Sequence, residues 1–420
     1  MGVSGDGAAI PATPGGAAAR RRALTVILLT ILINMIGVGL AWPILPKLVQ
    51  SMGSGAVSEA AAAYAVIGTI YALAQFLFGP LIGMLSDRFG RRPVMLVSLA
   101  GLAADYVFAA LAPNLVWLAF ARLLGGILGA TLPTANAYVT DISEPADRAR
   151  IFGLIGAAFG LGFILGPLIG GVLGAIDIRL PFWAAAAMAA VNLVLAWAFL
   201  PESLAPQNRR TDLVAREANP LASLRKIGRF PALTPLLIAL LITATAQRGL
   251  EATWVLYTEF RFGWTVRDAA FSLAFVGVMY VIVQGGLVGP VVRLVGDWRT
   301  VIAGFAISCV SLAFYGLADH GWMVYPLIAG YVLGNGLGAP ALTALCSKSV
   351  DDDRQGQLQG TLQAVNALAI ILGPLLASLV LAHVSAPDPV LAVPGLWFIA
   401  GAVAFIVSIG LALRARPATM

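Results

Sequence analysis

The 420-residue sequence has little charge, cysteine or histidine. Charged residues make up 11% of it, whereas soluble domains carry about 25%. The two cysteines, Cys309 and Cys346, are too few for a disulfide framework, and we interpret both as small packing residues. The two histidines, His320 and His383, are isolated, and no nucleophile–base or metal-ligand cluster accompanies them. These absences argue against a soluble domain, a disulfide scaffold, an enzyme and a metal site.

Apolar residues dominate instead, at 60% of the chain with a mean hydropathy of +0.90. A membrane-spanning helix needs about 20 apolar residues, and stretches of that length fill most of the sequence. We therefore predict an all-α integral membrane protein, in which twelve transmembrane helices form two pseudo-symmetric six-helix halves. The predicted spans are 24–46, 60–82, 94–112, 115–140, 151–174, 180–200, 232–258, 268–290, 300–318, 322–346, 360–384 and 392–413.

Positive charge is concentrated on one side of these spans. Most Lys and Arg residues fall in the tails, the central loop and alternate short loops, and the exceptions between spans are Lys47, Arg179, Arg261 and Arg267. The positive-inside rule then places both termini in the cytoplasm. We expect a disordered cytoplasmic tail at 1–23, helical halves at 24–200 and 232–413, a cytoplasmic loop at 201–231 and a cytoplasmic tail at 414–420.

A short basic turn joins the second and third spans. It reads Gly83-Met-Leu-Ser-Asp87-Arg88-Phe-Gly90-Arg91-Arg92. Glycines allow helix ends to approach closely, Asp87 can cap a helix or pair with a cation, and arginines stay out of lipid. We interpret the turn as a gate that docks against the other half, for example at the N-terminal end of the eleventh span, with Asp141 available to Arg91.

The two halves resemble repeats. Gly79-Pro80 is followed by Asp87, and Gly289-Pro290 is followed by Asp297 at the same offset. Gly166-Pro167 in the fifth span has a counterpart in Gly373-Pro374. A parallel duplication of this kind places a binding site at the middle of the membrane, between halves that rock.

Polar residues inside the spans mark the candidate site, because each costs free energy in lipid unless it meets a partner or a cavity. Asp105 lies near the middle of the third span and Arg122 lies in the fourth. A carboxylate can bind and release a proton, whereas Arg stays charged. Asp105 is the preferred proton carrier and Arg122 the fixed charge that tunes it; the alternative is a structural ion pair.

The seventh span carries a second polar cluster of Gln247, Arg248 and Glu251. Arg248 and Glu251 are three residues apart and can pair on one helix face, so a local pair is as good an explanation as proton coupling. Uncharged polar or aromatic residues in both halves would suit a translocation cavity. These candidate substrate-binding residues are Asn34, Gln75, Asn136, Gln247, Trp254, Tyr280, Gln284 and Asn335.

Several of these segments together resemble one family. The basic turn matches the loop signature of the major facilitator superfamily, and Gly162, Gly166, Pro167 and Gly170 resemble the antiporter motif of its proton-driven drug exporters. Further segments are similar to the tetracycline:proton antiporters. These are Asn34-Met-Ile-Gly-Val-Gly-Leu-Ala-Trp-Pro-Ile-Leu-Pro46, Asp105-Tyr106, Gly129-Ala-Thr131 and Trp254-Val-Leu-Tyr-Thr-Glu-Phe-Arg-Phe-Gly-Trp264.

The resemblance implies an inner-membrane exporter of a drug-like molecule, driven by proton entry. It implies no cofactor, a substrate that arrives as a metal chelate, and no partner beyond substrate, protons and lipid; we expect a monomer that does not bind nucleic acid. Asn34, Tyr280 and Ser308 replace titratable residues of that family, which leaves tetracycline as substrate and the proton stoichiometry open. The alternatives are a carrier for another metabolite, a transporter-derived receptor and a membrane enzyme.

Overall fold

The computed structural model describes residues 16–129, 131–210, 230–351 and 354–415. Within these ranges the regular secondary structure is entirely helical, and twelve segments are long and apolar enough to cross a membrane. The predicted all-α class and the twelve spans are therefore confirmed. Most of the first tail and of the central loop lie outside the described residues.

The first half contains α1 to α8 and the second contains α10 to α16. In chain order the helices are α1 (Gly16–Ala41), α2 (Leu45–Ser51), α3 (Val57–Phe89), α4 (Arg91–Leu111), α5 (Leu115–Leu128), α6 (Thr131–Ile142), α7 (Pro145–Ile176), α8 (Leu180–Phe199), η1 (Pro206–Asn208), η3 (Pro231–Leu233), α10 (Thr234–Phe262), α11 (Val266–Ile282), η4 (Val283–Leu287), α12 (Val288–Val295), α13 (Asp297–Leu317), η5 (Gly321–Met323), α14 (Val324–Lys348), α15 (Gln355–Val384) and α16 (Leu396–Arg414).

Three of the predicted spans are interrupted. The first ends at Ala41, because Pro43 disfavours helix in the residue before it, and the chain resumes as the short helix α2. The fourth is divided between α5 and α6, where Pro133 has no N–H to donate to the carbonyl of Gly129. The eighth contains the π-helical turn η4, which includes Gly285 and Gly286.

Glycines with positive φ make the corresponding tight turn in each half. Gly90 ends α3 with φ of 104°, and Gly296 ends α12 with φ of 82°. Relative to these turns, the two aspartates of the expected repeat are not equivalent: Asp87 lies in the last turn of α3, whereas Asp297 begins α13. The equal spacing from each Gly-Pro pair did not make the two aspartates equivalent, because the segment from the Gly-Pro pair to the turn glycine is shorter in the second half.

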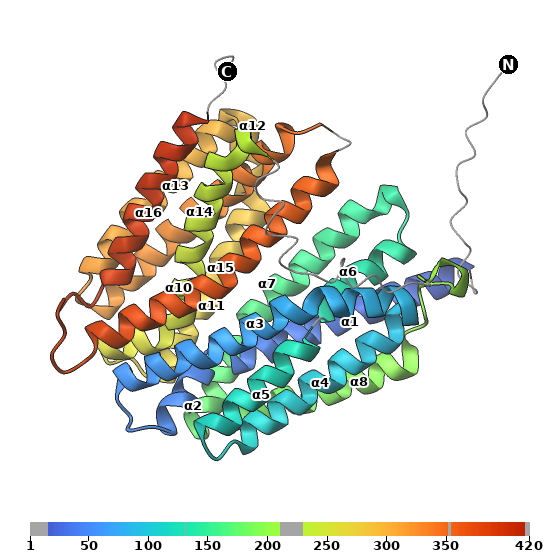
Figure 1. Ribbon diagram of the computed structural model, residues 1–420, viewed down its shortest axis with the longest axis horizontal. Coiled ribbons are helices and arrows are strands. Elements are labelled where there is room, and N and C mark those ends of the chain that lie inside the picture. Colours follow the sequence, from blue (N-terminus) through green and yellow to red (C-terminus); the bar gives the residue numbers. More distant parts are fainter. Residues whose placement is uncertain (1–15, 130, 211–229, 352–353, 416–420) are drawn as a thin grey trace.

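The two halves meet at one end of the bundle and spread apart at the other (Figure 1). We call the end where α1 begins and α16 ends the terminal end, and the opposite end, which carries α2, the far end. Near the far end a Cβ added to Gly174 of α7 would lie 3.5 Å from Val266 of α11. Toward the terminal end, a Cβ added to Gly153 or Gly156 of α7, or to Gly289 of α12, would meet nothing within 4 Å. The structure is therefore closed at the far end and open at the terminal end.

Candidate functional site

A pocket lies between the two halves, and we call it the deep pocket. The first half contributes Trp42 and Phe163, whose rings are 5.2 Å apart. The second half contributes apolar and aromatic residues together with Glu251. These are Gln247, Leu250, Glu251, Trp254, Leu273, Val276, Tyr280, Tyr315, Ile328, Tyr331 and Val332. A mainly apolar pocket with a few placed polar groups suits an amphipathic ligand.

A second, more polar pocket lies in the second half, nearer the terminal end, and we call it the terminal pocket. Along α10, α11 and α14 its residues always lie on the terminal side of those that line the deep pocket. Gln247 and Tyr280 line both pockets. The other lining residues are Leu240, Thr243, Ala244, Gln284, Asn335, Ala339, Pro340, Thr343 and Asn366.

A hydrogen-bonded network separates the two pockets. Gln247 Nε2 donates to the Tyr280 hydroxyl at 3.0 Å and to Glu251 Oε1 at 2.9 Å, and Asn335 Nδ2 donates to Gln247 Oε1 at 2.9 Å. Arg248 Nη1 donates to Glu251 Oε2 at 2.9 Å, which confirms the predicted pair on one helix face. Residues 247, 280 and 335 each lie near the middle of their spans, so the network sits close to the bilayer midplane.

The predicted substrate-binding residues are only partly brought together. Five of them line one or both pockets: Gln247, Trp254, Tyr280, Gln284 and Asn335. Three lie outside the lining of both. Asn34 is buried in α1, Gln75 lies beside the break between α5 and α6, and Asn136 is exposed on α6.

Asp105 and Arg122 form a buried ion pair inside the first half. Arg122 Nη2 lies 2.6 Å from Asp105 Oδ2, and the Asp105 side chain is 1% exposed. The carboxylate packs against α5, where a Cβ added to Gly125 would lie 2.6 Å from the carboxyl carbon. Neither residue lines either pocket. Both charges belong to neighbouring helices of the same half, which fits either predicted role.

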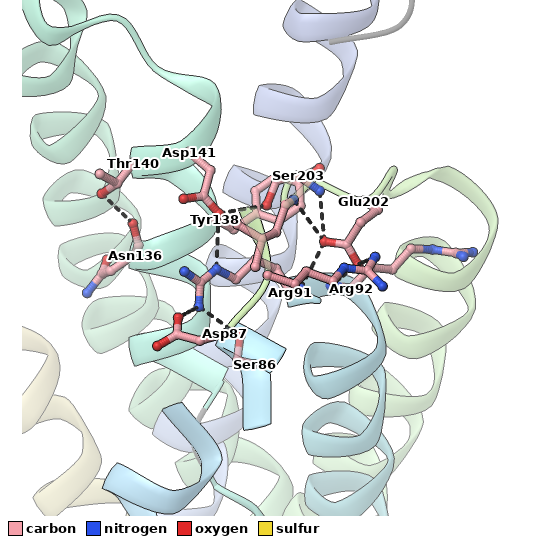
Figure 2. A network of polar contacts seen from close by, with 12 residues as sticks. Ser86, Asp87, Arg91, Arg92, Asn136, Tyr138, Thr140, Asp141, Glu202 and Ser203 are labelled. Atoms are coloured by element: carbon pink, nitrogen blue, oxygen red, sulfur yellow. Dashed lines mark hydrogen bonds and ion pairs between the residues drawn. The ribbon is translucent and has the colours of Figure 1, made fainter. Parts of the chain in front are cut away.

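The basic turn between α3 and α4 is built around Arg91 (Figure 2). Its guanidinium donates to Asp87 Oδ1 at 2.6 Å and to Asp141 Oδ2 at 3.0 Å, so the predicted contact with Asp141 is confirmed. Glu202, which follows α8, accepts from the backbone N–H of Arg91 at 2.8 Å and caps α4. Asp87 also accepts from the backbone N–H of Arg210, through its carbonyl at 3.0 Å.

The remaining residues of this turn have distinct places. Gly83 faces open space, since an added Cβ would meet nothing within 4 Å, whereas one on Gly90 would clash with Glu202. Arg88 lies over the ring of Phe89. Arg92 donates to the carbonyl of Trp197 at 2.6 Å. The partners just named belong to the first half or, in the case of Glu202, to the start of the central loop, so docking of the turn against the second half stays a prediction.

An ion pair of reversed polarity occupies the corresponding place in the second half. Asp297 at the start of α13 pairs with Lys348 at the end of α14. In the first half the start of α4 carries the cation Arg91 and the end of α6 carries the anion Asp141. In each half, therefore, an ion pair joins the third and fourth spans at the terminal end.

At the far end an ion pair joins the two halves. Lys47 of α2 pairs with Glu259 of α10, and their side chains are 11% and 29% exposed. Lys47 Nζ also donates to Gln50 at 3.2 Å. Sequence reasoning did not pair these residues, because they lie 212 positions apart.

The glycines of the predicted antiporter motif pack α7 against α1. A Cβ added to Gly166 would lie 2.5 Å from Cα of Gly39, and one added to Gly170 would lie 2.5 Å from the carbonyl oxygen of Leu40. Gly162 likewise faces Met35, and Pro167 lies inside α7 next to this contact. The motif therefore lets the backbones of α1 and α7 touch.

The model of the Major Facilitator Superfamily matches residues 27–374 and 287–419. The chain belongs to this superfamily. It is thus a membrane transporter for small molecules, and the reading as an enzyme is excluded. Two solved superfamily structures share the fold. A human organic anion transporter matches with a TM-score of 0.70 and 26% sequence identity, and the match covers 94% of this chain and 99% of that one. A nucleoside transporter matches with a TM-score of 0.75 and 12% sequence identity, and the match covers 94% of this chain and 98% of that one.

Curated relatives within the superfamily are tetracycline resistance proteins, the group that the motifs resemble. The chain is 40% identical over 361 residues to the class C tetracycline resistance protein of Escherichia coli, which covers 86% of this chain and 90% of the relative. It is 37% identical over 355 residues to the class G protein of Vibrio anguillarum, and this match covers 84% of this chain and 89% of the relative. The predicted resemblance is confirmed.

Sequence reasoning missed several residues of this transporter's site. Trp42, Phe163, Tyr315 and Tyr331 line the deep pocket but are indistinguishable in sequence from aromatic residues that pack helices or face lipid. Glu202 had one available signal, a carboxylate just after a span and close to a basic turn.

Proposed function

We propose that this transporter exports an amphipathic, drug-like organic molecule of the tetracycline type across the bacterial inner membrane in exchange for protons. The observation that carries the proposal is the deep pocket. It lies between the halves, has lining residues from both, and combines a mainly apolar and aromatic wall with a few polar groups, as pockets for drug-like ligands do. The similarity to tetracycline resistance proteins supports this substrate class.

The proposed cycle is alternating access with the terminal end in the cytoplasm, as the distribution of Lys and Arg favours. In this orientation the structure corresponds to an inward-open state. Substrate enters through the terminal pocket, reaches the deep pocket and leaves when the far end opens and the Lys47–Glu259 pair separates. The gate formed by Asp87 and Arg91 closes the terminal end in that second state. The transporter works as a monomer and needs no cofactor.

Purified protein in liposomes tests this function. Vesicles loaded at acidic pH and diluted into alkaline buffer have an outward-directed proton gradient, and in wild-type vesicles we expect tetracycline to accumulate inside against its own gradient as protons leave. A protonophore should abolish the accumulation. Omitting Mg²⁺ tests whether the substrate travels as a metal chelate. Downhill flux that ignores the pH gradient would favour a uniporter, and binding without flux would favour a receptor.

The direction of insertion needs a separate measurement. A cysteine introduced at exposed Phe89 beside the basic turn should react with an impermeant maleimide only after cells are opened. One introduced at exposed Asp388, between α15 and α16, should react in intact spheroplasts. The opposite pattern would reverse the proposed direction of transport.

A further inference from the structure

The two pockets form one path interrupted by a polar partition. Going inward from the terminal end, α10 presents Thr243, then Gln247 and then Trp254. The chain runs the opposite way in α14, which presents Thr343, then Asn335 and then Tyr331. The polar terminal pocket and the mainly apolar deep pocket thus follow one another along the same helices. Gln247 and Tyr280 belong to both.

This partition depends on Gln247, which uses all its hydrogen-bonding groups within the network. Its amide nitrogen donates to Glu251 and Tyr280, and its amide oxygen accepts from Asn335. The three contacts tie α10 to itself, to α11 and to α14. Glu251 therefore accepts one of the three hydrogen bonds that hold Gln247 in this orientation.

Glu251 is the carboxylate that lines the deep pocket, at the place where both halves meet. Its side chain is 19% exposed and lines the pocket, so a ligand in the pocket can reach it, and it is paired with Arg248. Asp105 differs in each respect. It is 1% exposed, it lines neither pocket, and its partner Arg122 belongs to the same half.

We propose that Glu251 is the residue at which protons and substrate exchange, and that it controls the partition formed by Gln247, Tyr280 and Asn335. The proposal rests on proton-driven export as the function, and it assigns the coupling role to α10 in place of Asp105. The groups that face Glu251 are Arg248 on its own helix, Tyr280 on α11 and Tyr331 on α14; Trp42 and Phe163 from the first half carry no titratable group.

The network suggests how exchange occurs. Ionised Glu251 accepts from Gln247 and Arg248, which holds the partition together. A substrate that reaches Glu251 with a hydrogen-bond donor needs the ionised form, so it binds as the proton leaves. Protonation of Glu251 after substrate departure frees Arg248 from its anion. Because both events occur at one carboxylate, substrate and proton are bound alternately, as exchange requires.

Proton release on substrate binding provides the direct test. In weakly buffered detergent solution, at an acidic pH at which Glu251 is protonated, adding the preformed tetracycline–Mg²⁺ chelate to wild type should release protons. Glu251→Gln should bind the drug without release, whereas Glu251→Asp should restore part of the release because it keeps a carboxylate. Asp105→Asn should lower the yield of folded protein but keep release, and Asp388→Asn, at an exposed loop, should match wild type.

Transport in liposomes gives the second readout. A gradient of about one pH unit supports about tenfold accumulation if one proton enters per substrate, because a factor of ten corresponds to about 1.4 kcal/mol. Glu251→Gln should reduce the accumulation ratio to about one while exchange of labelled for unlabelled drug continues. If Glu251→Gln folds poorly, Arg248→Gln/Glu251→Gln removes both charges and replaces it.

Infrared difference spectra between acidic and basic pH need no substrate. They therefore test the role of Glu251 independently of the proposed transport function. We expect a protonated-carboxyl band that Glu251→Gln removes and Asp105→Asn leaves. Coupled transport by Glu251→Gln, or loss of the band only in Asp105→Asn, would overturn the role of Glu251. Absence of gradient-driven transport in wild type would overturn proton-driven export, while the spectra would still decide whether Glu251 titrates.

Discussion

Removing the positive charge of Lys47 should open the far end of the transporter. Lys47 and Glu259 belong to opposite halves and pair where those halves are in contact. In a state that is open at the far end both charges would be hydrated and apart, so the pair stabilises only the closed far end. Lys47→Gln therefore shifts the balance between the two states without changing the interior of either half.

The size of the shift follows from burial. Exposed ion pairs contribute about 0.2–1 kcal/mol, whereas breaking a fully buried pair costs about 3–5 kcal/mol. With side-chain exposures of 11% and 29%, this pair lies between the two cases, and we expect about 1–2 kcal/mol. That corresponds to an increase of about five- to thirtyfold in the population open at the far end. The charge-swapped variant Lys47→Glu/Glu259→Lys should restore most of the wild-type population that is closed at the far end.

Cysteine labelling can measure this change. The probe is Val266→Cys, because Val266 packs against Gly174 at the junction of the halves. The background carries Cys309→Ala and Cys346→Ala, which remove the two native thiols. Lys47→Gln should raise the rate of labelling from the far side by about five- to thirtyfold. Equal rates in wild type, single variant and swapped variant would show that the pair does not hold the far end closed.

Three further substitutions test the packing and the gate. Gly166→Ala should destabilise the protein by about 1–3 kcal/mol, because the new methyl group meets the backbone of Gly39, whereas Gly153→Ala on the same helix faces open space and should leave the melting temperature in detergent unchanged or higher. Gly125→Ala should lower that melting temperature similarly by pushing on the Asp105 carboxylate, and an unchanged value would mean that α4 and α5 pack loosely there. Asp87→Asn should reduce tetracycline transport while the amount of folded protein in the membrane stays normal, because it weakens the contact with Arg91 at a turn where the Asp87 side chain is 32% exposed. Wild-type turnover would leave the turn with a topological role only.

Helix count and local pairs could be predicted because they depend on short-range sequence. A span is an apolar run, and Arg248 and Glu251 meet simply because residues three apart share a helix face. The contact of Arg91 with Asp141 could be predicted because the start of α4 and the end of α6 lie at the same membrane surface. These predictions needed no knowledge of how the halves sit together.

Features that arise from packing between distant segments could not be predicted. The pair of Lys47 with Glu259 exists only once the halves close at the far end. The deep pocket takes Trp42 and Phe163 from the first half through the same arrangement. The π-helical turn at Gln284 accommodates an extra residue within a helix, which an apolar run of spanning length does not reveal. The sequence thus predicted the helices better than the surfaces on which they meet.

The anchoring of the central loop has a mechanical consequence. Glu202 caps α4 (Figure 2), and the backbone N–H of Arg210 donates to the carbonyl of Asp87. The start of the loop is therefore fastened to the turn that joins α3 and α4. The covalent connection between the halves therefore departs from the first half at this turn. When the second half swings, any tension carried by the chain is applied first at Asp87 and Arg91. One turn would then respond both to the approach of the partner half and to the pull of the tether behind it.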